Sequence, residues 1–130
     1  VTTIGYEAFD RCNNLTSVTI PDSVTSIDDS AFERCDSLEN IIIGNGVISI
    51  GEKAFYSCDN LKSITIPDSV TSIGSWSFFG CHSLIRVNIG KNVSTIGNAA
   101  FHSCYDLKSI RIPDSVTSMG SNVFSNCESF

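Results

Sequence analysis

The chain has 130 residues, of which 42% are hydrophobic and 17% are charged, and its formal net charge is −6. This length suits a single domain, and the negative charge argues against a nucleic acid as partner. No apolar run approaches the roughly 20 residues of a membrane span, so the sequence predicts no membrane insertion.

A motif of 23 residues, VTSIGxxAFxxCxxLxSIxIPDS, fills the chain. The complete copies cover 1–23, 24–46, 47–69, 70–92 and 93–115, and a partial copy covers 116–130. A fixed period without insertions predicts a solenoid, in which each unit packs mainly on its neighbours. No polar capping unit is visible at either end, so we expect 1–130 to be one solenoid cut from a longer array.

Each repeat opens with a short extended piece, in which Val24 and Ile27 of the second copy are predicted to face inward. A sharp bend follows at a glycine such as Gly51 or Gly74, where the second copy has Asp28. Aspartate is among the residues that tolerate a left-handed backbone, so the pattern suggests that conformation at the bend.

An Ala-Phe pair comes next, for example Ala54-Phe55. The spacing of Ile, Ala-Phe and Cys fits one helical turn or a 3₁₀ turn. A run this short is not stable alone, so we expect the phenylalanine to anchor it in the stack. The repeated phenylalanine is then one long spine of the interior.

The cysteines are one residue repeated at the 23-residue period: Cys12, Cys35, Cys58, Cys81, Cys104 and Cys127. Stacked coils place neighbours about 4.8 Å apart, within disulfide range, but side chains in a column point the same way. No Cys-x-x-Cys occurs, and a straight row of sulfurs does not make a tetrahedral metal site. We therefore predict buried packing thiols and no metal or cofactor.

The last part of the repeat reads as a strand, with Leu15, Val18 and Ile20 inward in the first copy. Stacked coils would place these strands side by side and parallel in one continuous sheet. Pro21 ends the first strand, and even-numbered repeats have Gly44 or Gly90 at that place, which is also turn chemistry.

Residues 58–80 follow the pattern C-x-x-L-x-x-I-x-I-x-x-x-V-x-x-I-G-x-x-A-F, with Ser77 in place of alanine. This pattern resembles the BspA-like, Treponema pallidum-type leucine-rich repeat over the whole chain. The resemblance implies an α/β-type solenoid with a concave parallel β-sheet and short helical or 3₁₀ turns. It also implies a cell-surface or secreted location, a role in adhesion and no shared catalytic residues, so we expect no enzyme.

On the concave sheet, the outward positions vary between repeats while the inward positions hardly change, as expected for recognition on a fixed scaffold. Arginines and exposed apolar residues are typical of interfaces. The candidate binding residues are Asn40, Ile42, Lys62, Thr65, Ile85, Arg86, Asn88, Lys108 and Arg111. The alternative is that these positions vary because nothing constrains them.

A second candidate site is aromatic. Its residues are Tyr56, Trp76, Phe79, His102 and Tyr105, of which Tyr56, Phe79 and His102 share one column. Contiguous exposed aromatic side chains can mark a protein or carbohydrate site. Because the column directly follows the inward phenylalanine, these rings can equally be padding for that side of the coil.

Three functions are compatible with this pattern. The leading interpretation is a non-catalytic binding module, an adhesin-type fragment that engages a host-matrix or cell-surface protein, or a glycan, through the concave sheet. The alternatives are a structural spacer and the targeting region of a larger enzyme. Uncapped ends expose sheet edges, so we also expect that chains can associate end to end.

The charge is uneven along the chain. Residues 1–69 carry 11 acidic and 4 basic side chains, whereas residues 70–130 carry 3 acidic and 4 basic ones. This asymmetry can steer a charged partner towards one end. The alternative is drift of exposed positions between repeats.

Overall fold

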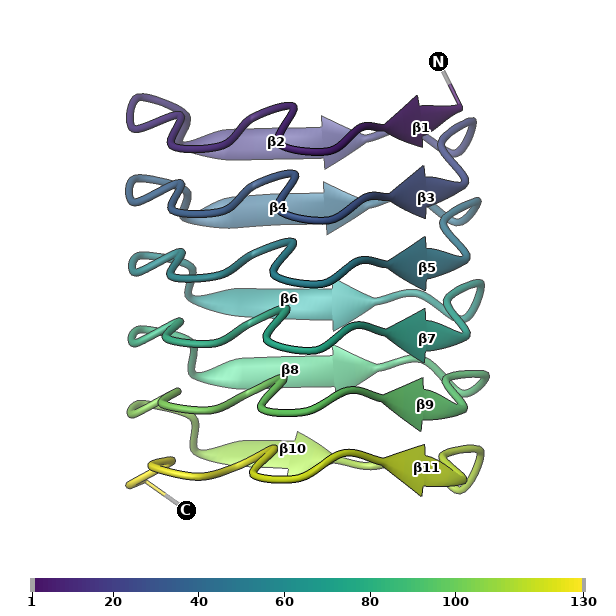
Figure 1. Cartoon of the computed structure of the whole chain (residues 1–130), viewed down its shortest axis with the longest axis vertical. Helices are drawn as coiled ribbons and strands as arrows, with labels where there is room; N and C mark the ends of the chain where they lie inside the picture. The colour runs from purple at the N-terminus through teal and green to yellow at the C-terminus, as the bar shows by residue number, and fades with distance from the viewer. Residues whose placement is uncertain (1, 130) are drawn as a thin grey trace.

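The computed structural model describes residues 2–129 as a stack of coils, one for each repeat (Figure 1). A longer strand lies on one side of each complete coil and a two-residue strand on the other, and bends join them. The described residues contain eleven strands and no helix. Val1 and Phe130, the outermost residues of the predicted array, lie outside the described residues.

The short strands form one continuous parallel sheet in the order β1-β3-β5-β7-β9-β11. They are β1 (Thr3–Ile4), β3 (Ser26–Ile27), β5 (Ser49–Ile50), β7 (Ser72–Ile73), β9 (Thr95–Ile96) and β11 (Ser118–Met119). Ile27 pairs with Ile50, and Ile50 pairs with Ile73, so the 23-residue period is the sheet register.

The longer strands do not form the single continuous sheet predicted from the sequence. They are β2 (Ser17–Ile20), β4 (Asn40–Ile43), β6 (Ser63–Ile66), β8 (Arg86–Ile89) and β10 (Ser109–Arg111). Parallel pairing joins β2 to β4 and β6 to β8 to β10, and it is absent between β4 and β6 among the described residues.

Proline and glycine alternate after these strands, and the break lies where proline follows. Gly44 and Gly90 follow β4 and β8 and keep an N–H, and both strands pair over their full length with the strand before them. Pro67 and Pro113 follow β6 and β10 and have no N–H to donate back to the preceding coil. Pairing is lost between β4 and β6 but is only shortened to three residues between β8 and β10, so a following proline weakens pairing without by itself abolishing it.

The phenylalanine side of the coil is a series of turns without a helix among the described residues, so the predicted helical or 3₁₀ turn is not confirmed. Lys53 (φ 57°) and Ser57 (φ 55°) of the third repeat are left-handed, and this conformation interrupts any helical path. Between them, Ala54 N–H donates to Gly51 O in its own coil, whereas Phe55 N–H donates to Ser77 O of the next coil at 2.7 Å. The solenoid thus uses alternate N–H groups to join coils, and a helix would keep them internal.

The bend glycine has a different role from the one suggested by the sequence. Asp28, Gly51 and Gly74 do not have positive φ, so the bend is not left-handed. Instead the coils approach closely here: a Cβ on Gly74 would lie 2.6 Å from the carbonyl carbon of Gly51. At Gly5, by contrast, a Cβ would meet nothing within 4 Å.

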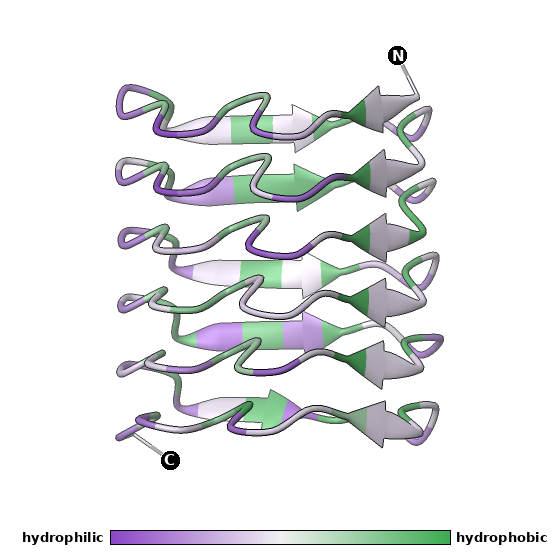
Figure 2. Ribbon diagram, in the orientation of Figure 1, coloured by the Kyte–Doolittle hydropathy of each residue, from purple (hydrophilic) through white to green (hydrophobic). Residues whose placement is uncertain are grey.

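The core runs through the whole stack as repeated columns of apolar side chains, and hydrophobic bands recur at the same place in successive coils (Figure 2). The predicted phenylalanine spine is confirmed, because Phe32, Phe55, Phe78 and Phe101 are 0% exposed. Ring centroids of Phe55 and Phe78 are 5.2 Å apart, with an interplanar angle of 7°. All the cysteines are free thiols, buried in the middle of the stack and half-buried at Cys12 and Cys127.

Candidate functional site

The longer strands present one face to solvent, which we call the long-strand face. It consists of the outward side chains on β2, β4, β6, β8 and β10 together with the residue that precedes each strand. The inward neighbours Ile64 and Val87 are buried at 2% and 3% exposure. All nine sequence-predicted residues of this face are exposed. The structure therefore places every predicted member on the accessible side of the strands.

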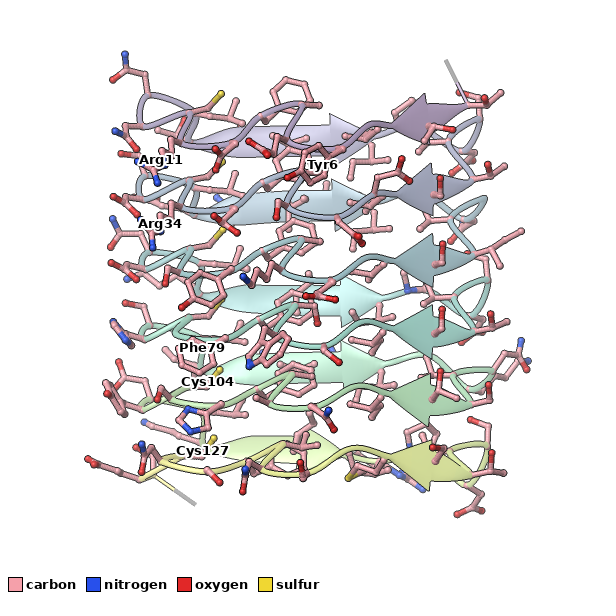
Figure 3. The ribbon with its side chains drawn as sticks, in the orientation of Figure 1. Tyr6, Arg11, Arg34, Phe79, Cys104 and Cys127 are labelled. Carbon is pink, nitrogen blue, oxygen red and sulfur yellow. The ribbon has the colours of Figure 1, made fainter. Side chains whose placement is uncertain are left out.

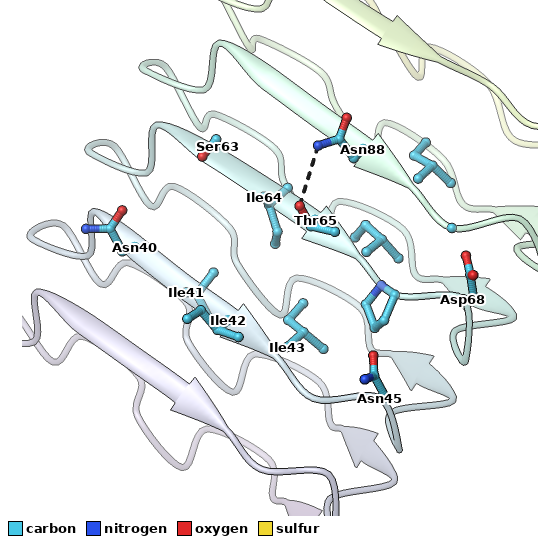
Figure 4. A pocket seen from close by; sticks show the side chains of 14 residues that line it. Asn40, Ile41, Ile42, Ile43, Asn45, Ser63, Ile64, Thr65, Asp68 and Asn88 are labelled. Carbon is cyan, nitrogen blue, oxygen red and sulfur yellow. Dashed lines mark hydrogen bonds between the residues drawn. The ribbon is translucent and has the colours of Figure 1, made fainter.

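A hollow of about 720 Å³ lies on this face across β4, β6 and β8, over the break in pairing (Figure 4). Four of the predicted residues line it: Asn40, Ile42, Thr65 and Asn88. Asn88 Nδ2 lies 3.5 Å from Thr65 Oγ1, to which it donates a long hydrogen bond (Figure 4). Ile42 is the exposed apolar residue of the lining, with 64% of its surface accessible.

Asn45, Ser63 and Asp68 also line the hollow, although they are not among the nine candidate binding residues. Asn45 and Asp68 occupy the same turn position in successive repeats, directly beyond the strands. The sequence signal for this turn position is the aspartate that recurs in the repeat motif, as in Asp22, Asp68 and Asp114. Its carboxylate also joins coils, because Asp68 Oδ1 accepts the N–H of Lys91 at 3.0 Å.

A second hollow of about 430 Å³ continues the surface towards β10. It is lined in part by Asn88, Lys91, Arg111 and Asp114. Since Asn88 lines both hollows, the long-strand face is hollowed from β4 to β10. The remaining predicted residues, Lys62, Ile85, Arg86 and Lys108, lie on the same face outside the linings of these two hollows.

The predicted aromatic column is present, on the turn side of the coils (Figure 3, where Phe79 is labelled). Tyr56 stacks on Phe79 with ring centroids 5.0 Å apart, and Phe79 stacks on His102 at 4.7 Å. At the end of this column, Lys53 Nζ lies 5.8 Å from the Tyr56 centroid and Arg34 lies 6.0 Å from it. The rings thus cover one another's faces and present their edges to solvent. This arrangement suits packing against the coil better than stacking on a sugar.

The other two aromatic candidates lie apart from that column. Tyr105 stacks on His82, which is not among the five candidate residues, with ring centroids 4.8 Å apart. His82 Nδ1 in turn lies 3.6 Å from Asp59 Oδ1. Trp76, which is 37% exposed, has Lys53 5.9 Å from its ring. The five predicted residues therefore form one stack of three, Trp76 beside it through the shared Lys53, and Tyr105 in a second stack with His82.

The thiols offer little for chemistry. Burial raises the pKa of Cys35 to about 11 and raises the pKa of Cys58, Cys81 and Cys104 further above the ordinary value of 9.0. A protonated buried thiol is neither a nucleophile nor a metal ligand. Among residues 2–129 no group of three or more His, Cys, Asp or Glu side chains is placed to hold a metal ion. This part of the chain also has no helix long and apolar enough to cross a membrane.

A family model described as the BspA type leucine-rich repeat region matches residues 2–130 in six copies. No curated protein sequence matches the chain. Several solved structures do. A leucine-rich cell surface protein from Faecalibacterium prausnitzii is 34% identical over 100% of the chain, with a TM-score of 0.69.

Two further structures are similar. The pneumococcal vaccine antigen PcpA is 28% identical over 97% of the chain, with a TM-score of 0.84, and a Treponema pallidum leucine-rich repeat protein is 28% identical over 100%, with a TM-score of 0.75. The chain spans 41% of the Faecalibacterium protein, 34% of PcpA and 72% of the Treponema protein. For the first two, the similarity thus concerns a minor part of a larger protein.

Proposed function

The chain belongs to the BspA-type leucine-rich repeat family, and we propose that it is a non-catalytic binding module of a cell-surface protein. It engages a protein or a glycan through the long-strand face. The observation that carries the proposal is the hollow of about 720 Å³, whose exposed lining differs between repeats above a buried scaffold that repeats.

The chemistry of the hollow supports a recognition role. Asn40, Asn88 and Thr65 supply amide and hydroxyl groups, and Ile42 supplies an apolar contact beside them. Ligand sites commonly combine apolar lining with a few polar groups that fix orientation. Nucleophilic chemistry has no comparable support, because the thiols of Cys35, Cys58, Cys81 and Cys104 are buried and burial raises their pKa.

The comparisons support the surface location. One similar structure is described as a cell surface protein and another as a vaccine antigen. A stack of coils that contact their neighbours suits an extended surface array, because affinity can be spread over several repeats.

Ile42 provides the test, with Ile48 as its matched control. Both isoleucines are exposed, at 64% and 51%, but Ile48 precedes β5 and lies outside the hollow. The whole chain is screened for capture of extracellular-matrix proteins and on a glycan array, and each captured ligand is then titrated. We expect Ile42→Ser to weaken binding about five- to thirtyfold, as the loss of an apolar interface anchor does, and Ile48→Ser to leave it unchanged.

Equal effects of the two substitutions would place binding elsewhere on the molecule. Failure of the unsubstituted chain to capture any ligand on either panel would favour the spacer alternative. Both outcomes contradict the proposed site.

A further inference from the structure

The long-strand face carries a charge opposite to that of the whole chain. The net charge of the protein is −6, yet four of its eight basic residues are outward residues of this face. These residues are Lys62, Arg86, Lys108 and Arg111. Glu39 is the one acidic residue among the corresponding described positions, and it precedes Lys62 in the same column, because the Lys62 N–H donates to Glu39 O at 3.5 Å.

These four cations have no acidic partner among the described residues. The ion pairs within 4.0 Å in residues 2–129 are Arg11 with Asp10 and His82 with Asp59, both on the turn side. Turn-side cations are engaged in other ways too, since Arg34 lies over the Tyr56 ring. The positive charge of the long-strand face is therefore not neutralised by a carboxylate in contact with it.

The cations surround an apolar residue. The backbone N–H of Ile85 donates to Lys62 O at 2.8 Å, and the N–H of Lys108 donates to Ile85 O at 3.2 Å, so these three residues form one column. Neighbouring strands are about 4.8 Å apart, which places the two lysines roughly 10 Å apart with Ile85 between them. Ile85 is 39% exposed, and Arg86 is the next residue in the chain.

Arg111 extends the positive surface along the strands. It pairs in register with Asn88, two residues beyond Arg86 on the neighbouring strand. Asp114 lies near it at the lining of the second hollow. The nearby Asp68 carboxylate is already used to accept the Lys91 N–H. The surface from β6 to β10 thus combines separated cations with one exposed isoleucine.

Resting on the proposed function, we propose that the surface from β6 to β10 binds an acidic polypeptide segment that also carries an apolar side chain. The separated cations complement the charge of carboxylates distributed along an extended segment. A sulfated glycan would satisfy the cations and leave Ile85 without an apolar partner, so the composition favours a polypeptide. Complementary charge supplies specificity and a faster association rate.

The experiment measures fluorescence anisotropy of a short labelled peptide of Glu and Leu, and of its Gln and Leu counterpart, with the whole chain. Arg86→Gln/Arg111→Gln removes two charges from the face. The control, Arg11→Gln/Arg34→Gln, removes the same charge from the turn side. Because all four residues are exposed, both variants are expected to fold, and circular dichroism checks this.

The acidic peptide is expected to bind, its glutamine counterpart not to bind, and raised salt to weaken the complex. The face variant should weaken binding roughly two- to thirtyfold, the range that two exposed ion pairs give, and the control should retain it. Equal weakening by both variants would overturn the proposal, as would binding of heparin without binding of the peptide. If the peptide fails while Ile42→Ser still lowers capture of a surface ligand, the acidic partner is wrong and the proposed function stands.

Discussion

Cys58 donates a hydrogen bond of 3.2 Å from its thiol to the backbone carbonyl oxygen of Phe32 in the preceding coil. The same contact joins Cys81 to Phe55 at 3.2 Å and recurs along the stack. Each of these carbonyls also accepts the N–H of the cysteine in its own coil, as Phe32 O accepts Cys35 N–H at 3.3 Å. The position therefore needs a small apolar side chain with a weak donor, and cysteine meets that need.

This thiol column makes stability sensitive to alkaline pH. Burial raises the pKa of Cys35 to about 11 and that of Cys58 further, from an ordinary value of 9.0. As pH rises past about 9, the unfolded chain loses thiol protons first while the native state keeps them. The contribution of the protonated thiols to the free energy of unfolding is thus complete below pH 9. It is lost as pH rises towards 11 and beyond.

Urea unfolding at pH 7, 8.5 and 10 measures this effect. We expect the free energy of unfolding to be the same at pH 7 and pH 8.5 and to be lower at pH 10. In Cys58→Ala one of the titrating thiols is absent, so the fall should be smaller. A free energy that stays level to pH 10 in the unsubstituted chain would contradict the assignment.

The phenylalanine spine predicts a large cost for truncation at its centre. Phe55 is 0% exposed and lies between Phe32 and Phe78, at centroid distances of 5.3 and 5.2 Å. Phe55→Ala should lower the free energy of unfolding by about 3–5 kcal/mol through lost burial and a residual cavity. Phe9, at the first position of the column, is 39% exposed, and Phe9→Ala should cost clearly less in the same denaturation assay. Equal losses would disprove the spine.

Ser77 is the polar exception in a column of alanines that ends in Val123, and its substitution by alanine should stabilise the fold. Its side chain is 0% exposed, and its hydroxyl has no hydrogen-bond partner among the described residues, whereas Ala31, Ala54 and Ala100 occupy the equivalent place. Ser77→Ala should raise the free energy of unfolding by about 1–3 kcal/mol, the penalty of an unsatisfied buried hydroxyl. The reverse change, Ala54→Ser, should lower it by a similar amount. Destabilisation by Ser77→Ala would show that the hydroxyl is satisfied.

The repeat and its apolar columns could be predicted because each inward position is a direct consequence of the 23-residue period. The turn conformation could not, since the left-handed positions are held by residues such as Trp76 and Ala99, which carry no local signal for that conformation. Hydrogen bonds between coils impose it, as the Phe55 N–H to Ser77 O bond illustrates. Tertiary contacts here decide the backbone against local preference.

The candidate site was predictable in part for the same reason. The alternation of buried and exposed residues placed Ile42 and Asn88 outward correctly. The break beside them was not predicted, because the 23-residue period gives every pair of neighbouring strands the same expected pairing, whereas the structure leaves β4 and β6 unpaired. The hollow and the contribution of Asn45 follow from that three-dimensional arrangement.

The central claim is that recognition takes place on the long-strand face and not on the aromatic turn side. Hydroxyl-radical footprinting of the whole chain, with and without a captured ligand, measures side-chain protection on both surfaces at once. Ile42 and Ile85 report on the first surface, and Trp76 and Tyr105 report on the second, and all four are at least 37% exposed. The account predicts that the ligand protects the two isoleucines and leaves Trp76 and Tyr105 as reactive as before. Protection of Trp76 and Tyr105 with unchanged isoleucines would contradict it.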